Sequence, residues 1–375
     1  MKKIIFDVDS VLQGVSIVCG SAAEKSTMPI LCDIIIKCKG NICDFVSSDG
    51  EQWVSVTCDK VMCDDEFHAA VNAKDFLSAM KNLSGQTVRL EADDETHQMA
   101  IVYDNGSFSI PMDNIEDFPS VTYDSEKLFT TKVPVSSLIT AIQFTKGCAT
   151  PNVLRPIMYG IHIDFMPDKL IGVALDMCKM SKYENLDIKS EGDAGHGVTI
   201  PFKAATALTA LAGKKEGDIR VRFEEKCVIF SSDTFSLFAR LHEGKYPPYD
   251  QLLRFPTTYM ASVIRCELAD AIRRITAAGC TEGGAVTLAF DENGITATSE
   301  NVGFSKSAKE RIACEYNGDA FSVNVDGRIM YSLLSSITAD NVRLEMSGQA
   351  HPVIITPAYN EEHQEQYTSL IMPMQ

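Results

Sequence analysis

The stretch IPFKAATALTALAGKKEGDIRVRF, residues 200–223, contains a pattern that recurs elsewhere in the chain. Its alanines and leucines at helical spacing predict a helix that begins at Pro201, a residue tolerated at the first helical position. Gly213 is typical of a helix end. Strict alternation of apolar and charged residues over positions 219–223 then predicts a strand. The stretch therefore reads as helix, charged turn and strand.

The same unit begins again at Asn72 and at Asn324, where a helical pattern runs to Leu83 and to Ile337 before an alternating strand. The arginines of the three strands, Arg89, Arg220 and Arg343, are 131 and 123 positions apart. A near-constant period indicates repeated structural units, and this period is as long as a domain. We therefore predict three tandem domains, 1–125, 126–255 and 256–375.

Each repeat also opens with a strand and another helix. The predicted opening helices cover residues 10–23, 135–148 and 267–279, and Asp9 or Ser10 can cap the first of them. Hairpins follow at 33–47, 161–175 and 286–299, with turn residues that tolerate tight conformations. Runs of strands with only two helices per repeat predict an α+β fold with antiparallel sheets rather than a doubly wound parallel sheet.

Composition excludes several classes of protein. No window holds 18 consecutive apolar residues, so we expect no membrane span. The N-terminus turns acidic at Asp7, too early for a signal peptide, which favours a cytoplasmic protein. The twelve cysteines are therefore expected to be reduced thiols, among them Cys38 and Cys43. Their spacing lacks the pairs typical of zinc, so we expect no metal and no cofactor.

The charge is unevenly spread. The formal net charge is −17, which argues against a protein that coats nucleic acid with its whole surface. The six predicted helices nevertheless carry a net positive charge, from Lys25, Lys74, Lys81, Lys146, Lys203, Lys214, Lys215, Arg273, Arg274 and Arg328. Any one of them can be an ordinary solvated residue. Together they suit a basic inner face that surrounds DNA without gripping it.

Short strings through the whole chain resemble the β subunit of bacterial DNA polymerase III, the sliding clamp. They are Thr27-Met28-Pro29-Ile30-Leu31, Phe108-Ser109-Ile110 with Asp117-Phe118-Pro119, Glu243-Gly244-Lys245-Tyr246-Pro247-Pro248-Tyr249, and Met372-Pro373-Met374. Each string is weak alone, but their order agrees with the three repeats. The resemblance implies three clamp domains per chain and a head-to-tail homodimer that forms a six-domain ring. Duplex DNA passes through such a ring without sequence readout.

The resemblance also assigns surfaces. Phe108 and Ile110 should lie at the dimer interface, although they could be ordinary core residues. Lys25 takes the place of a basic residue on the inner surface, and Asn152 and Arg155 lie in a loop that touches DNA in relatives. The tethered partners would be the polymerase α subunit, the clamp loader and other proteins that carry a clamp-binding peptide.

A pocket between the second and third domains takes that peptide in the family. Its wall would include Met158, Leu175, Met177, Lys179, Met180, Pro247, Leu252, Asn324, Pro352, Ile371, Met372, Pro373 and Met374. Flexible methionines suit a pocket that accepts varied peptides, while inter-domain core is the alternative. This chain departs from its relatives at residues 175–180, near Gly283 and at Gln375. The departures concern the peptide preference and not the fold.

Two rival interpretations remain open. Asp7 and Asp9, after a predicted strand, resemble the first motif of haloacid-dehalogenase-like phosphatases, in which one aspartate attacks phosphate beside Mg²⁺. That enzyme needs a parallel core, and the threefold repeat explains the same residues as a strand–helix junction. The other rival is a scaffold of clamp fold that does not encircle DNA. No other catalytic motif is present, so we expect a protein that is not an enzyme.

Overall fold

The computed structural model describes residues 2–374 except positions 64, 124–127, 152–153, 189–190, 214, 279–283, 302, 304 and 360–362. None of the described helices has the length and apolar character that crossing a bilayer requires. Among the described residues, no three His, Cys, Asp or Glu side chains are grouped to hold a metal ion. The predictions made for Asn152, Lys214, Gly283 and Gln375 concern positions outside the described residues.

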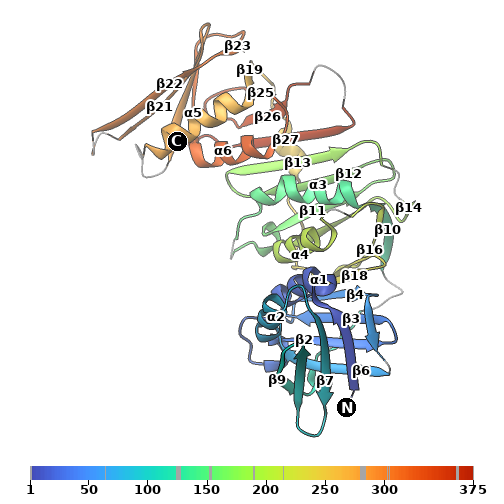
Figure 1. The fold of residues 1–375 in the computed structure, drawn as a ribbon. Coiled ribbons are helices and arrows are strands. Elements are labelled where there is room, and N and C mark those ends of the chain that lie inside the picture. Colours follow the sequence, from blue (N-terminus) through green and yellow to red (C-terminus); the bar gives the residue numbers. More distant parts are fainter. Residues whose placement is uncertain are drawn as a thin grey trace. The chain divides into compact units, whose positions relative to one another are not determined.

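Three segments of the chain have the same order of elements, which confirms the predicted repeat (Figure 1). Each has a strand, a helix, five strands, a second helix and three strands. The first runs β1 (Lys2–Asp7), α1 (Val8–Ser21), β2 (Asp33–Lys39), β3 (Ile42–Ser48), β4 (Gln52–Cys58), β5 (Val61–Cys63), β6 (Glu66–Asn72), α2 (Ala73–Asn82), β7 (Thr87–Asp93), β8 (Gln98–Tyr103) and β9 (Gly106–Asp113).

The second repeat runs β10 (Phe129–Pro134), α3 (Val135–Thr145), β11 (Gly160–Phe165), β12 (Leu170–Leu175), β13 (Lys179–Asn185), β14 (Glu191–Gly192), β15 (His196–Pro201), α4 (Phe202–Ala212), β16 (Asp218–Phe223), β17 (Cys227–Ser231) and β18 (Phe235–Arg240). The third runs β19 (Tyr259–Ile264), α5 (Arg265–Ala277), β20 (Ala285–Asp291), β21 (Gly294–Asn301), β22 (Lys306–Ile312), β23 (Cys314–Tyr316), β24 (Phe321–Asp326), α6 (Gly327–Ser336), β25 (Asn341–Met346), β26 (Val353–Pro357) and β27 (Glu365–Ile371). All the strand pairs described are antiparallel, as the α+β prediction requires.

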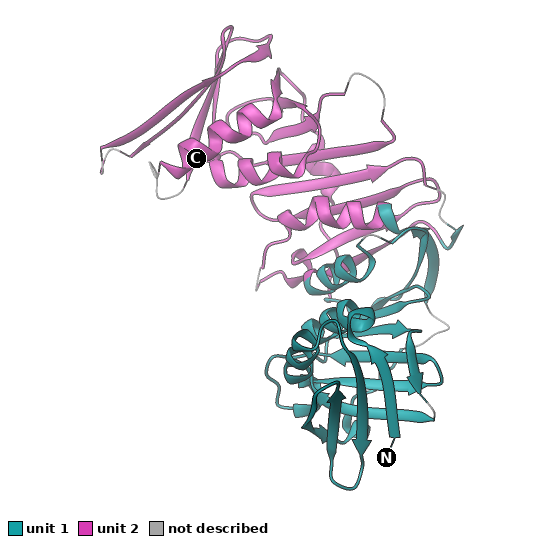
Figure 2. Ribbon diagram, viewed as in Figure 1, with its two compact units in different colours: residues 1–136, 191–193, 203–242 teal, residues 137–190, 194–202, 243–375 magenta. Residues whose placement is uncertain are grey.

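The chain forms two compact units (Figure 2). Unit 1 comprises residues 1–136, 191–193 and 203–242, and unit 2 comprises residues 137–190, 194–202 and 243–375. In unit 1 the strands form one sheet of fourteen, ordered β14-β10-β16-β17-β18-β4-β3-β2-β6-β9-β8-β7-β1-β5. The strands of the first and second repeats meet in this sheet where β18 pairs with β4, from Phe235 opposite Val56 to Ala239 opposite Gln52.

Unit 2 contains a nine-stranded sheet, ordered β15-β11-β12-β13-β27-β26-β25-β19-β23. The second and third repeats meet in it where β13 pairs with β27, from Lys179 opposite Ile371 to Asn185 opposite Glu365. A separate four-stranded sheet, ordered β22-β21-β20-β24, belongs to the third repeat. Helices α5 and α6 pack side by side, and α5 also contacts β21 and β22 (Figure 1).

Two glycines allow helices to approach the sheets closely. A Cβ atom added at Gly14 of α1 would lie 2.7 Å from Val56 Cγ1 on β4. A Cβ atom added at Gly172 of β12 would lie 2.7 Å from the Cβ of Ala141 on α3. Because real Cβ atoms do not approach so closely, each position needs a residue without a side chain.

Three predicted helix starts are wrong, because polar caps and strand pairing decide them. Helix α1 begins at Val8, and Asp7 rather than Asp9 or Ser10 is its cap, with Asp7 Oδ1 accepting from the N–H of Ser10 at 3.2 Å. Pro201 ends β15 instead of beginning α4. In the third repeat β24 continues past Asn324, and Asp326 caps α6 through the N–H groups of Arg328 and Ile329.

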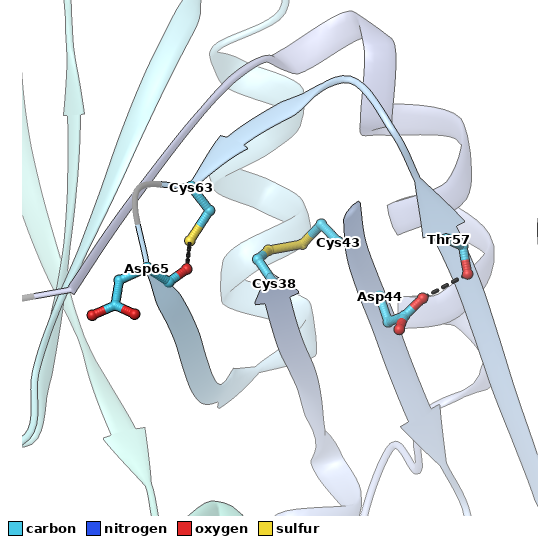
Figure 3. The surroundings of a disulfide bond; sticks show 6 residues. All are labelled: Cys38, Cys43, Asp44, Thr57, Cys63 and Asp65. Atoms are coloured by element: carbon cyan, nitrogen blue, oxygen red, sulfur yellow. Dashed lines mark hydrogen bonds between the residues drawn. A yellow bond between two sulfur atoms is a disulfide. The ribbon is translucent and has the colours of Figure 1, made fainter. Parts of the chain in front are cut away.

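The prediction that the cysteines are all reduced is wrong for one pair. Cys38 and Cys43 form a disulfide across the β2–β3 hairpin (Figure 3). The two-residue turn Gly40-Asn41 places Lys39 opposite Ile42, so that Cys38 and Cys43 are the next pair along, with Cα atoms 4.1 Å apart. Directly opposed residues of an antiparallel hairpin are close enough for a disulfide when the pair has no mutual backbone hydrogen bonds.

Candidate DNA, peptide and dimer interfaces

The predicted basic residues that the structure describes are all exposed. Lys25, Lys74, Lys81, Lys203 and Lys215 belong to unit 1, and Lys146, Arg155, Arg273, Arg274 and Arg328 belong to unit 2. The sequence placed Lys25, Lys146 and Lys215 on helices, but they lie beyond the observed helix ends: α1 ends at Ser21, α3 at Thr145 and α4 at Ala212. The helices themselves are therefore less basic than predicted, and the turns that follow them carry part of the positive charge.

Acidic neighbours neutralise part of this set. Lys203 pairs with Asp49, and Arg274 pairs with Glu310. Arg273 pairs with Asp270 at 3.1 Å, and Arg328 pairs with Asp326 at 3.0 Å. The four cations are exposed, whereas Asp49 and Asp326 are only 11% and 17% exposed, so salt screens these pairs only in part. The net positive charge that this set presents is accordingly smaller than the sequence alone suggests.

The buried part of the predicted peptide pocket forms one apolar cluster in unit 2. Met158, Leu175 and Met180 are each at most 3% exposed and pack with Ile171, Val173, Tyr246, Tyr249 and Leu370. Leu175 and Met180 are paired across β12 and β13, and Met180 is opposite Leu370 on β27. The sequence interpretation missed Tyr246, Tyr249 and Leu370, although Tyr246 and Tyr249 lie within the string that carried the resemblance.

The rest of the predicted pocket surrounds this cluster. Ile371 is buried opposite Lys179 and Val353, the residue after Pro352. Beyond β27 the chain continues along its neighbours, since Met372 N–H donates to the carbonyl of Cys178 and Met374 N–H donates to the carbonyl of Asn324, each at 2.8 Å. Three apolar side chains of the set stay exposed: Met177 (73%), Leu252 (40%) and Met372 (38%). Pro247 and Pro373 are half-buried. Exposed apolar side chains near a buried apolar cluster offer a surface on which an extended peptide can pack.

Lys179 occupies the predicted region but its ammonium group has other partners. Its Nζ donates to the carbonyl of Gly147 at 2.7 Å and lies 3.9 Å from Asp176 Oδ2. Asp176 Oδ1 in turn accepts from the N–H groups of Cys178 and Lys179. Lys179 therefore stabilises the turn that presents Met177, and its ammonium group is not free for a ligand.

The predicted interface residues Phe108 and Ile110 lie on β9 in unit 1. Phe108 is 37% exposed, and with Ile110, Tyr103 and residues of α2 it lines a groove of about 530 Å³. Strand β9 pairs with β8 along its length, but its ladder to β6 covers only Val71 opposite Met112 and Ala70 opposite Asp113. One edge of β9 around Phe108 and Ile110 thus faces away from the described sheet, so these residues are not ordinary core.

The carboxylates of the phosphatase-like motif have structural partners. Asp7 caps α1, and Asp9 Oδ1 accepts from Ser84 Oγ at 2.6 Å and from the N–H of Gly85 at 3.2 Å. Both side chains tie the start of α1 to its surroundings. They lie beside antiparallel β1, so the parallel core of that enzyme class is lacking in the described sheets.

Profiles of one protein family match the chain in three consecutive segments. The DNA polymerase III beta subunit N-terminal domain matches residues 2–122, its central domain matches residues 132–248 and its C-terminal domain matches residues 255–375. The chain belongs to the DNA polymerase III beta subunit family. It is thus a sliding clamp, a processivity factor and not an enzyme.

Relatives agree over nearly the full length. The "Beta sliding clamp" of Staphylococcus aureus is 25% identical over 369 residues, which cover 94% of this chain and 93% of the relative. The crystal structure of the DNA polymerase sliding clamp from Bacillus subtilis superposes with a TM-score of 0.90 at 20% identity, covering 100% of this chain and 99% of that one. The sliding clamp from Pseudomonas aeruginosa gives 0.89 at 17% identity and covers 100% of both chains. The fold is thus that of a clamp, in a divergent sequence.

Proposed function

We propose that two copies of this chain close head to tail into a ring around duplex DNA and tether the replicative polymerase to it. The observation that carries the proposal is the way the repeats are joined within one chain. The strand after each hairpin begins at Gln52, Lys179 or Lys306, at a constant interval of 127 positions. In two of the three cases this strand pairs with the last strand of the next repeat, as β4 with β18 and β13 with β27.

Among the described strands of one chain, β22 has no corresponding pairing with the last strand of another repeat. Strand β22 pairs with β21, and the described sheet ends there. Strand β9, the last strand of the first repeat, has the open edge around Phe108 and Ile110. If β22 of one copy pairs with β9 of the other, this contact follows the same pattern as the β4–β18 and β13–β27 pairings within the chain. Two such contacts would join the two copies at both ends. A head-to-tail contact that closes in this way makes a ring.

A groove lies beside each of the two strands β22 and β9. A groove of about 300 Å³ between α5 and β22 is lined by Asp270, Arg274, Glu310, Arg311 and neighbours. The groove of β9 is apolar at Phe108 and Ile110 and has Asp75 at its margin. The groove beside β22 is thus lined by mixed charges and the groove beside β9 is largely apolar, so the surfaces next to the two edges are unlike.

Within the ring, we assign the exposed basic residues to the DNA-facing surface and the cluster around Met158 to partner binding. The partners are the polymerase α subunit, the clamp loader and other proteins with a short apolar peptide. Because sliding needs few phosphate contacts, residence on DNA depends on ring closure rather than on affinity. The DNA contacts carry no base readout, since phosphate contacts position a protein without reading sequence.

Retention on DNA tests this function. The chain, loaded by its clamp loader onto a nicked circular plasmid, should stay bound through gel filtration and be lost when the plasmid is linearised. A protein that binds DNA by affinity alone would behave alike on both forms. Equal retention on circular and linear DNA, or none on either, would contradict the proposal and favour a scaffold that does not encircle DNA.

A further inference from the structure

One face of β11 carries a polar cluster that none of the proposed binding roles uses. His162 and Asp164 lie two positions apart on this strand, so they share a face, while Ile161, Ile163 and Phe165 are buried on the opposite face. The two imidazole nitrogens are both occupied: Nε2 lies 3.1 Å from Asp164 Oδ1 and Nδ1 lies 3.0 Å from Thr199 Oγ1. The imidazole is therefore fixed in one orientation.

The space for this pair is made by a glycine on the neighbouring strand. Gly197 is opposite Asp164 in the ladder of β11 and β15. A Cβ atom added at Gly197 would lie 2.3 Å from Asp164 Oδ1 and 2.9 Å from the ring of His162. The absence of a side chain at Gly197 is thus a condition for the His162–Asp164 contact.

The pair holds the segment that follows the second repeat. The ring of Tyr246 stacks on His162 with centroids 4.7 Å apart and planes 6° apart. The hydroxyl of Tyr249 donates to Asp164 Oδ2 at 2.6 Å. Lys182 adds a third attachment, with its Nζ 3.3 Å from Asp250 Oδ1 and 5.6 Å from the centre of the Tyr249 ring.

The groups around Asp164 favour its ionised form, which accepts hydrogen bonds. Burial raises the pKa of this carboxyl, but hydrogen bonds from His162 and Tyr249 and the positive charge of Lys182 outweigh burial and lower it. Further charged side chains near this pair are Asp250, Glu184, which is 3.1 Å from Lys182 Nζ, and Lys169, which is 3.4 Å from Glu184. The carboxylate of Asp164 thus accepts two hydrogen bonds at once, one from the sheet and one from the segment.

We propose that His162 and Asp164 are positioning residues of the peptide pocket, which fix the wall formed by Pro247 and Leu252. This inference rests on the proposed function of that pocket. Pro247 follows the stacked Tyr246, and Leu252 lies in the short 3₁₀ helix Tyr249–Leu253 whose first residue Asp164 holds. Tyr246 and Tyr249 also pack in the cluster with Met158, Leu175 and Met180. If Tyr246 or Tyr249 is displaced, Pro247 and Leu252 therefore move relative to the buried cluster around Met158.

Binding and amide exchange together test the proposal on the full-length chain. A fluorescein-labelled, leucine-rich hexapeptide is titrated with the unaltered chain, with His162→Ala, with His162→Phe and with the control Lys169→Ala. His162→Ala removes the stack and two hydrogen bonds and should weaken binding about tenfold. His162→Phe keeps an aromatic ring under Tyr246 and should bind within about threefold of the unaltered chain. Lys169→Ala removes an ion pair on the same face that does not touch the segment, and should bind normally.

Amide exchange separates positioning from general damage. Exchange in His162→Ala should rise at residues 246–253 and stay unchanged in the strands of unit 1. Normal peptide binding by His162→Ala, or failure of His162→Phe to restore it, would overturn the positioning role while leaving the pocket intact. No binding of the hexapeptide by the unaltered chain would instead contradict the pocket itself, and the positioning role would fail with it.

Discussion

Asp33 and Asp113 form a carboxyl pair at the end of β2 in unit 1. Asp33 is 3% exposed, and Asp113 is the last residue of β9. Burial of Asp33, together with the charge and hydrogen bond of Asp113, raises the pKa of Asp33 to about 7. Because two neighbouring carboxylates repel when both are ionised, Asp33 keeps its proton up to about neutral pH.

This pair makes stability depend on pH. Between pH 4 and pH 7 the folded chain holds a proton on Asp33 that the unfolded chain has lost, so stability falls as pH rises through this window. Asp33→Asn should remove the effect, and we expect it to stabilise the protein more at pH 8 than at pH 5, by about 2 to 4 kcal/mol. Urea denaturation of both proteins at the two pH values measures the difference. Equal shifts at both pH values would show that Asp33 does not titrate in this range.

Single residues were the least predictable from the sequence. The hairpin turn at Gly40-Asn41 was predicted, and the pairing of Cys38 with Cys43 follows from it by counting one position outward on each strand. Spacing along the chain does not reveal this disulfide, because it depends on which residues are opposite each other across the hairpin. Tyr246 and Tyr249 were missed for a similar reason, since their contacts are with β11, about 85 positions away.

The disulfide has a direct chemical test. Under non-reducing, denaturing conditions, alkylation followed by digestion should leave Cys38 and Cys43 linked and unalkylated, while Cys58 and Cys63 are modified. Closing this short loop is expected to stabilise the protein by about 2 kcal/mol, because it restricts the unfolded chain. Mass spectrometry with and without reductant reads the linkage. Alkylated Cys38 and Cys43 in the non-reduced sample would contradict it.

At the scale of elements, close packing of helices on sheets depends on residues without side chains. The alternation of strands and the spacing of helices were predictable because each element has its own period. The contact between α3 and β12 at Ala141 and Gly172 was not, since a glycine within a strand pattern does not reveal which helix approaches it. The cap Asp326 was likewise not predicted, because β24 continues to this residue, past the helix start that the sequence pattern placed at Asn324.

The helix contact predicts opposite effects of two similar substitutions. Gly172→Ala places a Cβ atom against Ala141 and should lower stability by about 1 to 3 kcal/mol through overpacking. Gly20→Ala, in α1, meets no atom within 4 Å and should be neutral or slightly stabilising, because alanine favours the helix. Thermal denaturation of both variants makes the comparison. Equal melting temperatures would show that α3 yields to the added methyl group at no cost.

The open edge of β9 predicts the outcome of an interface variant. Phe108→Ala combined with Ile110→Ala removes apolar area from the groove beside α2 and should convert the dimer largely to monomer at micromolar concentration. Met62→Ala, also exposed and in the first repeat, is the matched control and should remain dimeric. Light scattering at several concentrations reads the assembly. An unchanged dimer in the double variant would place the interface elsewhere.

We expect the C-terminal residues 372–375 to be needed for peptide binding but not for dimer formation. Deleting Met372–Gln375 removes the segment that Cys178 and Asn324 hold beside the cluster, and should weaken hexapeptide binding at least tenfold. The dimer should persist, because β9 and β22 are untouched. Fluorescence anisotropy and light scattering on the same sample measure both properties. Peptide binding that survives the deletion would remove these residues from the pocket.

At the scale of the whole molecule, the threefold repeat was readable because it needs only spacing along one chain. The three domain boundaries, 1–125, 126–255 and 256–375, remain predictions, although the matched segments of the family fall close to them. The joints between repeats were not predictable, since antiparallel pairing of β4 with β18 joins strands about 180 positions apart. The ring proposed for this protein depends on a third pairing of this kind, between β22 of one copy and β9 of the other.

Electron microscopy of the purified chain tests that pairing most directly. Class averages should show closed rings, each containing two chains, with a hole wide enough for duplex DNA. Two copies that meet head to tail without closing would instead grow into filaments, and chains whose edges do not pair would stay single. Filaments or single chains at micromolar concentration would contradict the pairing of β22 with β9.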